Sequence, residues 1–190
     1  MSTSAQAMQS TETCNITREI IRCANFSAIK HKDQRRKDPE MTPYINHPIG
    51  VAYILTEAGI TDLSVIQTAL LHDTVEDTST TFDEIEAEFG KEVRDLVAEL
   101  SDDKTLMKED RKRLQIEHAP HASPKAKLVK LADKLHNLRD LQRTVPRGWS
   151  QQRVRRYFIW AAKVVAGLRG TNKIMEDALD EIFKERNVYV

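Results

Sequence analysis

Apolar residues recur three and four positions apart along most of the chain. The clearest case is a stripe of four leucines downstream of Ser123-Pro124: Leu128, Leu131, Leu135 and Leu138. Serine followed by proline is typical of an N-cap and a first helical position, so the stripe predicts one face of an amphipathic helix. No segment alternates apolar and polar residues as a half-buried strand does. The pattern predicts an all-α fold.

Cap and turn residues divide the chain into successive helices. We expect a first helix, capped by Asn15 or Thr17, that runs to about residue 31. Further helices are expected over about 48–59, from 61 or 62 through the segment 70–78, and over 81–90, 91–100, 106–117, 124 onward, 150–168 and from after Thr171 to about 187. The run Thr81-Phe82-Asp83-Glu84 fits a capping box. With mostly short loops and no internal repeat, these helices predict a single-domain bundle over residues 15–190. Residues 1–14, rich in Ser, Thr, Ala and Gln, predict a flexible tail.

Composition narrows the function classes. The 190 residues suit one domain, and 40% hydrophobic with 31% charged residues is ordinary for a globular protein. Net charge is zero, which disfavours a dedicated nucleic-acid or membrane-surface binder. Cys14 and Cys23 do not make a disulfide framework, and no apolar run approaches transmembrane length. We therefore expect a cytoplasmic protein with no membrane partner, and the oligomeric state stays open.

The segment from Leu70 to Thr78 contains a dense group of titratable side chains. His72, Asp73, Glu76 and Asp77 fall within six residues of an otherwise apolar stretch. Spacings of three and four place them on one side of a helix. Burying so many titratable groups is costly unless they are paired or bind a metal, so the segment predicts a metal site. The alternative is a solvated face of a surface helix.

Two further residues could complete such a site. His47 lies between Pro43 and Pro48, which stiffen the backbone around it, although a helix cap or a packed core histidine would look the same. Asp133 lies beside the leucine stripe, although an exposed ion pair with Lys130 or Lys134 is the alternative.

Together these residues give the order His47, His72-Asp73, Asp133, which resembles the signature of the HD-domain phosphohydrolases. Four segments resemble the hydrolase domain of the RelA/SpoT family: Arg35-Arg36-Lys37, Pro43 to Pro48, Leu70 to Thr78 and Lys130 to Leu138. The resemblance covers about residues 16–186, and the length matches the small stand-alone members found in animals. There is no room for the synthetase domain of the long bacterial enzymes, so synthesis of the alarmone is not expected.

The resemblance implies roles for particular residues. His47, His72, Asp73 and Asp133 would hold one metal ion, usually manganese, and two imidazoles with two carboxylates suit such an ion better than structural zinc. Glu76 and Asp77 match the family's Glu-Asp pair, which positions or deprotonates a water activated by the metal.

The implied substrate is a polyanionic nucleotide. Arg36 and Lys37 match the basic pair that meets its phosphates, and Asn137 matches an asparagine of the nucleotide pocket. Three further positions resemble phosphate contacts, with a plain surface role as the alternative: Lys104, Lys108 and Arg153. His136 belongs to the motif, and we interpret it as support for the helix of Asp133 rather than as a ligand.

The expected reaction is metal-dependent hydrolysis of guanosine 3′,5′-bis(diphosphate), ppGpp, at its 3′ position, giving GDP and pyrophosphate. One alternative is a phosphatase acting on another nucleotide, such as the 2′-phosphate of NADPH. A non-catalytic nucleotide-sensing module is a second, and the intact Glu76 and Asp77 argue against it. A nucleic-acid binder using Arg35-Arg36-Lys37 is a third, and zero net charge disfavours it.

Overall fold

The structure is a computed structural model that describes the backbone of residues 3–189 and the side chains of residues 14–189. Its helices follow one another without intervening strands, apart from an isolated bridge between Arg35 and Pro43 in the described range. They are α1 (Thr3–Lys30), α2 (Asn46–Glu57), α3 (Leu63–Leu71), α4 (Thr74–Asp77), α5 (Phe82–Phe89), α6 (Lys91–Leu100), α7 (Lys108–His118), α8 (Pro124–Arg143), α9 (Gln151–Ala166) and α10 (Lys173–Glu185). The predicted all-α fold is confirmed.

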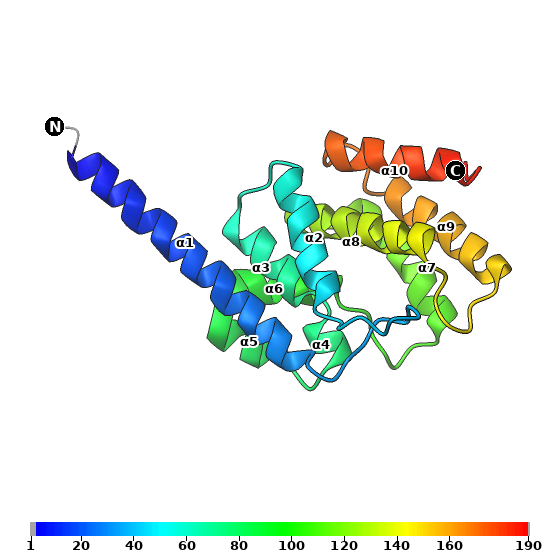
Figure 1. Ribbon diagram of the computed structural model, residues 1–190, viewed down its shortest axis with the longest axis horizontal. Coiled ribbons are helices and arrows are strands. Elements are labelled where there is room, and N and C mark those ends of the chain that lie inside the picture. The colour runs from blue at the N-terminus through cyan, green and yellow to red at the C-terminus, as the bar shows by residue number, and fades with distance from the viewer. Residues whose placement is uncertain (1–2, 190) are drawn as a thin grey trace.

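Helix α8 lies at the centre of the bundle and contacts α2, α3, α6, α9 and α10 (Figure 1). Three leucines of the predicted stripe, Leu131, Leu135 and Leu138, are at most 2% exposed and belong to the continuous apolar core. Leu128 packs against that core only partly buried. Burial of this stripe fixes the rotation of α8, and so decides which of its polar residues face the site.

Side-chain caps start the helices where the sequence predicts them. Thr81 accepts a hydrogen bond from the Glu84 amide at the start of α5, and Ser123 accepts one from the Ala126 amide at the start of α8. Ser150 caps α9 in the same way. Each cap satisfies an amide that has no partner within its own helix.

Helix α1 begins at Thr3, well before the predicted start at Asn15 or Thr17. The segment from Thr3 to Cys14 has no glycine or proline and contains several strong helix formers, so nothing in it stops the helix. It lacks an apolar stripe, which is why the sequence pattern predicts a tail there. Figure 1 shows this part of α1 extending away from the other helices. The division between tail and domain at residue 15 stays a prediction.

The segment from Leu70 to Thr78 is not one continuous helix, which corrects the sequence expectation. Helix α3 ends at Leu71 and α4 begins at Thr74. The His72 ring contacts the Ala69 carbonyl through Nδ1 at 2.8 Å, and the Thr74 hydroxyl donates to the Leu71 carbonyl at 2.6 Å. These bonds use carbonyls of the last turn of α3, so side chains end the helix locally. His72 and Asp73 consequently lie in the turn between α3 and α4.

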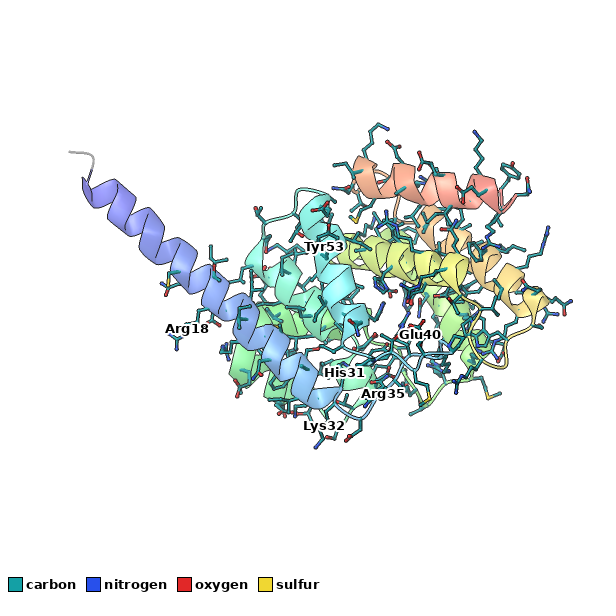
Figure 2. The ribbon with its side chains drawn as sticks, viewed as in Figure 1. Arg18, His31, Lys32, Arg35, Glu40 and Tyr53 are labelled. Atoms are coloured by element: carbon teal, nitrogen blue, oxygen red, sulfur yellow. The ribbon has the colours of Figure 1, made fainter. Side chains whose placement is uncertain are left out.

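The long segment between α1 and α2 contacts α8 and the turn that follows α8. Figure 2 shows His31, Lys32 and Arg35 where α1 ends, with Glu40 further along. The Arg147 amide in the α8–α9 turn donates to the Lys37 carbonyl at 2.8 Å. This contact holds two loops far apart in sequence beside each other.

Among the described residues, no helix combines the length and the apolar character needed to cross a membrane.

Candidate active site

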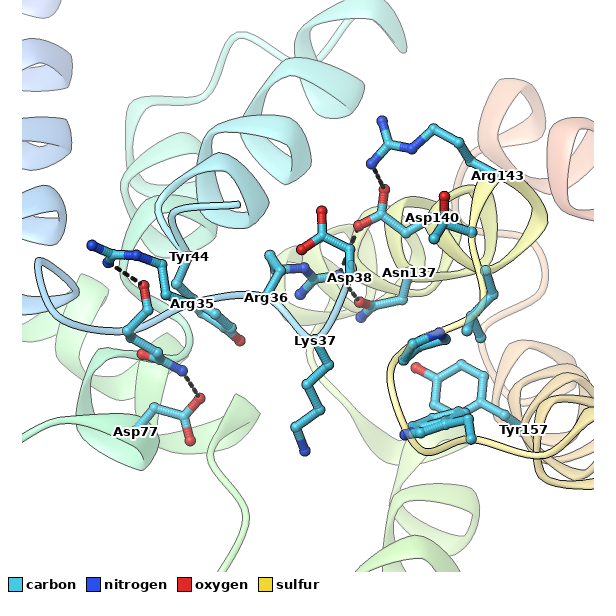
Figure 3. Close-up of a pocket in the computed structure, with 15 residues that line it drawn as sticks. Arg35, Arg36, Lys37, Asp38, Tyr44, Asp77, Asn137, Asp140, Arg143 and Tyr157 are labelled. Atoms are coloured by element: carbon cyan, nitrogen blue, oxygen red, sulfur yellow. Dashed lines mark hydrogen bonds and ion pairs between the residues drawn. The ribbon is translucent and has the colours of Figure 1, made fainter. Parts of the chain in front are cut away.

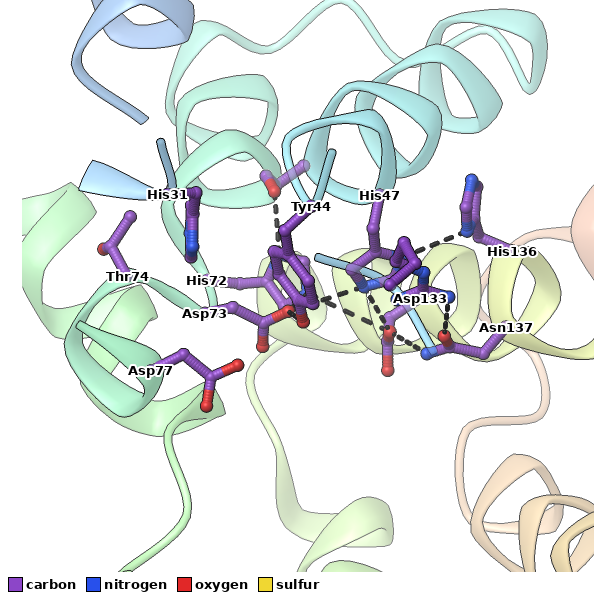
Figure 4. Close-up of polar contacts among 12 residues, drawn as sticks. His31, Tyr44, His47, His72, Asp73, Thr74, Asp77, Asp133, His136 and Asn137 are labelled. Atoms are coloured by element: carbon purple, nitrogen blue, oxygen red, sulfur yellow. Dashed lines mark hydrogen bonds and ion pairs between the residues drawn. The ribbon is translucent and has the colours of Figure 1, made fainter. Parts of the chain in front are cut away.

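Three segments bring two histidines and two aspartates together (Figure 4). His47 comes from the first turn of α2, His72 and Asp73 from the α3–α4 turn, and Asp133 from the middle of α8. His47 Nε2 lies 3.2 Å from Asp133 Oδ1 and 3.5 Å from Asp73 Oδ2. His72 Nε2 lies 3.1 Å from Asp73 Oδ2 and 3.9 Å from Asp133 Oδ1. The four residues predicted as metal ligands therefore lie side by side, and ligand atoms of His47, His72 and Asp133 all lie within 4.8 Å of one another.

The histidine rings are oriented with one nitrogen toward the two aspartates. His72 Nδ1 faces the Ala69 carbonyl, which can only accept, so Nδ1 carries the proton in the neutral ring and Nε2 presents a lone pair. That Nε2 is buried and makes no well-aligned hydrogen bond, although Asp73 Oδ2 lies 3.1 Å away. A buried nitrogen without a well-aligned partner is costly, and a cation held between His72, His47 and Asp133 would satisfy it.

The electrostatics of the cluster also favour a cation. Burial lowers the pKa of His47. Burial also acts to lower the pKa of His72, but the carboxylates of Asp73 and Asp133 outweigh it and raise that pKa to about 9. Burial acts to raise the pKa of Asp73 and Asp133, but the neighbouring positive groups hold both pKa values below their ordinary range. Two nitrogen and two carboxylate donors fit a divalent ion of intermediate hardness.

Neighbouring side chains fix the two carboxylates. Tyr44 donates its hydroxyl to Asp73 Oδ2 at 2.6 Å, and burial beside Asp73 raises the pKa of that phenol, so it remains a donor. Lys134 Nζ lies 2.8 Å from Asp133 Oδ2, and Asn137 Nδ2 donates to Asp133 Oδ1 at 2.6 Å. Such bonds hold potential ligands in one orientation before a metal arrives.

His136 supports His47 directly. The two rings approach at 3.0 Å through their Nδ1 atoms, and burial next to His47 lowers the pKa of His136 to about 4, so its ring is neutral. A neutral His136 can accept the Nδ1 proton of His47, which leaves Nε2 of His47 free for a metal. The ring of His136 packs against Gly50 of α2 so closely that a Cβ there would overlap its Nε2.

Glu76 and Asp77 lie on α4 at the edge of a cavity of about 240 Å³ that also contains the four clustered residues. Burial raises the pKa of Glu76, while the Asp102 amide donates to its Oε2 at 3.3 Å. Asp77 accepts from Gln34 at 2.9 Å and from Lys104 at 2.6 Å. A carboxylate with a raised pKa beside the cluster can take a proton from water near neutral pH.

A second cavity of about 410 Å³ adjoins the first and is basic and aromatic (Figure 3). Arg36 donates to Asn137 Oδ1 and Asp140 Oδ2, both at 2.9 Å, while Lys37 extends between Asp77 and Tyr157. The two cavities share four lining residues: Tyr44, Asp77, Asn137 and Tyr157. A ligand in the second cavity can thus reach the histidine-aspartate cluster.

The three further residues predicted as phosphate contacts lie at different distances from the two cavities. Lys104 joins the site through Asp77. Arg153 does not line either cavity, but its guanidinium lies 4.1 Å from the ring centroid of Trp149, which lines the second cavity. Lys108 is the exposed first residue of α7 and lines neither cavity.

Sequence reasoning did not assign four side chains that shape the site: Tyr44, Lys134, Trp149 and Tyr157. Tyr44 and Lys134 lie within the segments that resemble the RelA/SpoT family, so their proximity in sequence to His47 and Asp133 could have identified them as site residues. Trp149 lies directly before the Ser150 cap and Tyr157 lies seven residues after it, and this spacing does not indicate that the two rings line a pocket. They meet with ring centroids 5.9 Å apart only once α9 is packed.

Comparison with known proteins agrees with this arrangement. Residues 23–167 match the HD-domain family. The chain is 67% identical to the guanosine-3′,5′-bis(diphosphate) 3′-pyrophosphohydrolase MESH1 of Xenopus tropicalis, over 90% of this chain and 96% of that one. The human MESH1 is 65% identical, over 90% of this chain and 97% of the human protein.

Solved structures agree as well. A metazoan orthologue of SpoT, described as hydrolysing ppGpp, superposes with a TM-score of 0.88 at 55% identity, over 90% of this chain and 97% of the other. A protein from Listeria monocytogenes superposes with a TM-score of 0.64 at 33% identity, over 76% of this chain and 97% of that one. The chain therefore belongs to the HD-domain family, in the branch that contains the animal MESH1 proteins.

Proposed function

We propose that this protein hydrolyses ppGpp at its 3′ position, releasing GDP and pyrophosphate. The observation that carries the proposal is the pair of adjoining cavities, one with the histidine-aspartate cluster and one with basic and aromatic walls. The names of the animal relatives support the same substrate. A nucleotide with phosphates at both ends of its ribose would place one end in each cavity.

We propose that His47, His72, Asp73 and Asp133 hold one divalent metal ion, and that this ion is Mn²⁺. The close approach of donor atoms from His47, His72 and Asp133 and the mixed nitrogen and oxygen donor set support a metal here. When bound, such an ion supplies charge stabilisation at a phosphoryl group and makes water more acidic.

Glu76 would act as the general base. It accepts a proton from water as the water oxygen bonds to the phosphorus attached to the 3′ oxygen. The bond between that phosphorus and the 3′ oxygen breaks, the 3′ oxygen takes up a proton from solvent to become a hydroxyl, and Glu76 returns its proton to solvent. Asp77, held by Gln34 and Lys104, would orient the water beside Glu76.

The second cavity would hold the nucleotide. Trp149 and Tyr157 offer ring faces for the base, while Arg36 and Lys37 offer charge to phosphate. Because Arg36 is already held by Asn137 and Asp140, its fork is ordered before substrate arrives.

The test is turnover by purified, metal-analysed protein. After removal of metal by chelation, Mn²⁺, Mg²⁺ and Zn²⁺ are added back separately, and products from ppGpp and from NADPH are identified by ion-exchange chromatography. We expect GDP and pyrophosphate from ppGpp, with the highest rate on Mn²⁺ and at most one bound ion per chain. Release of phosphate from NADPH at a higher kcat/KM than that for ppGpp would overturn the substrate assignment. Location in the cytoplasm stays a prediction.

A further inference from the structure

A second set of cations lies at or near the histidine-aspartate cavity, and Arg36 and Lys37 do not belong to it. Lys130 and Lys134 lie one turn apart on α8 and both line this cavity. Lys112 comes from α7, and its Nζ lies 4.7 Å from the ring centroid of Trp160, which also lines the cavity. We refer to Lys112, Lys130 and Lys134 as the α7–α8 lysines. The proposed mechanism uses none of them as a substrate contact.

The α7–α8 lysines are not all neutralised by the protein. Lys134 is paired with Asp133. Lys130 Nζ has no hydrogen bond or ion pair among the described residues, and burial, together with the charge of Lys134, lowers its pKa. Burial also lowers the pKa of Lys112. Burying a cation without an anion is unfavourable, so these ammonium groups would gain from an anionic ligand.

Trp160 holds two of these cations in place. Lys134 Nζ lies 4.9 Å from its ring centroid, close to the 4.7 Å of Lys112. The indole Nε1 donates to the Lys112 carbonyl at 3.0 Å, which ties α9 to α7. Cation–π contacts favour the charged lysines, so the positive charge is ordered in the absence of a ligand.

A second unsatisfied donor lies beside Glu76. Arg111 on α7 approaches Glu76 with its NH1 atom 3.6 Å from Oε1, and its Nε is buried without a hydrogen-bond partner. Two basic side chains, Arg111 and Lys130, thus offer donors that the protein itself does not use.

We propose that Lys130, together with Lys134, binds the outer phosphate of the 3′-pyrophosphoryl group, and that the nearby charge of Lys112 adds to the attraction. The proposal rests on the proposed function and names the part of the site that selects a pyrophosphoryl over a monophosphoryl group. The clustered histidines and aspartates serve the inner phosphorus, where the bond breaks, and Arg36 and Lys37 serve the nucleotide. The outer phosphate is the end of the pyrophosphoryl group that carries about two negative charges, which Lys130 and its neighbours can neutralise.

The chemistry of the step is unchanged by this assignment. Water forms a bond to the inner phosphorus, the bond from that phosphorus to the 3′ oxygen breaks, and Glu76 takes the proton of water. The phosphoanhydride bond between inner and outer phosphorus stays intact, so the product is pyrophosphate. Lys130 touches only the oxygens of the outer phosphate and acts through binding.

The first test compares two substrates that differ only in the outer phosphate. Lys130→Met keeps the aliphatic part of the side chain and removes the charge. We expect kcat/KM for ppGpp to fall about tenfold or more, while kcat/KM for guanosine 5′-diphosphate 3′-monophosphate changes less than twofold. Equal losses on both substrates, or no loss on either, would overturn the proposal. Lys163→Met, on the exposed face of α9, is the matched control and should leave both values unchanged.

The second test does not depend on turnover. Inorganic pyrophosphate and inorganic phosphate are titrated by calorimetry into metal-loaded protein that has been freed of excess metal. Wild type should bind pyrophosphate at least tenfold more tightly than phosphate, Lys130→Met should lose that preference, and Lys130→Arg should restore most of it. An equal affinity for both anions in wild type would overturn the proposal. Failure of wild type to hydrolyse ppGpp would count against the proposed function alone, because anion preference is measured separately.

Discussion

The two adjoining cavities are built in different ways. The cavity of the histidine-aspartate cluster is lined mainly by residues of packed helices and of the α3–α4 turn, and its histidines are at most 7% exposed. The nucleotide cavity is lined by long side chains from the loop after α1 and from the α8–α9 turn, including the exposed Lys37. The first is held by core packing and the second by contacts between loops.

This difference matches the different needs of bond breaking and of nucleotide binding. Bond breaking needs donors placed within fractions of an ångström, which a core provides because its side chains have few alternatives. Nucleotide binding tolerates adjustment, since an arginine or lysine on a loop can follow a phosphate. We therefore expect substitutions in the first cavity to lower kcat and metal content, and substitutions in the second to raise KM.

The strongest test uses two aspartates of one helix. Asp133→Ala should lose the bound metal and lower turnover on the order of 10³-fold or more, because it removes a donor and leaves Lys134 unpaired. Asp140→Ala, two turns further along α8, should keep the metal and affect mainly KM. Metal content by plasma mass spectrometry and steady-state kinetics check both. A metal-loaded Asp133→Ala would remove Asp133 from the ligand set.

Glu76→Gln should separate metal binding from proton transfer. The amide of the variant cannot accept the proton of water, so kcat should fall about 10²–10⁴-fold with the metal retained. In wild type, burial raises the pKa of Glu76 above its ordinary value, and the base is active only when ionised. The rate should accordingly fall with decreasing pH, starting at a higher pH than for an exposed glutamate.

The pH dependence gives this prediction its own check. The acidic limb of kcat should disappear in Glu76→Gln while KM stays within about twofold. An unchanged acidic limb in the variant would mean that another group takes the proton.

Gly50→Ala should damage the first cavity without touching a ligand. The new methyl group would displace the His136 ring and break its contact with His47. Loss of such a supporting contact costs about 10–100-fold in metal affinity or activity. Gly50→Ala combined with His136→Ala, which makes room for the methyl group, should be no worse than His136→Ala alone. A Gly50→Ala protein with normal metal affinity would show that the contact is dispensable.

Arg36→Ala should give the smallest effect and show the character of the second cavity. Removal of a charged donor to phosphate should raise KM about tenfold, with kcat within about twofold and metal retained. Arg139→Ala, on the exposed side of α8, is the control. If Arg36→Ala lowered kcat as much as Glu76→Gln does, the assignment of bond breaking to the first cavity and nucleotide binding to the second would be wrong.

The fold was predictable where local signals decide it. The caps at Thr81 and Ser123 and the buried leucines of α8 follow from spacing and residue type alone. The break after Leu71 was not predictable from the sequence pattern. It depends on the side chains of His72 and Thr74, which bond to backbone carbonyls that would accept from backbone amides in a continuous helix. The early start of α1 was missed because a helix without an apolar stripe leaves no periodic signal.

The site was predictable only in part for a related reason. Family resemblance proposed His47, His72, Asp73 and Asp133, and the structure brings them together. Tyr44 and Tyr157 border both cavities, yet their place depends on how three distant segments pack. Lys108 shows the converse, since a residue that resembles a phosphate contact lines neither cavity.

The close packing of Gly50 against His136 has a consequence for interpreting inherited or evolved variants of this protein. If only the two histidines and two aspartates were considered, a substitution at position 50 would be classed as harmless, because glycine has no side chain that could bind metal or substrate. One added carbon at position 50 would move the His136 ring and break its contact with His47, so metal affinity or activity would fall with every ligand residue still in place.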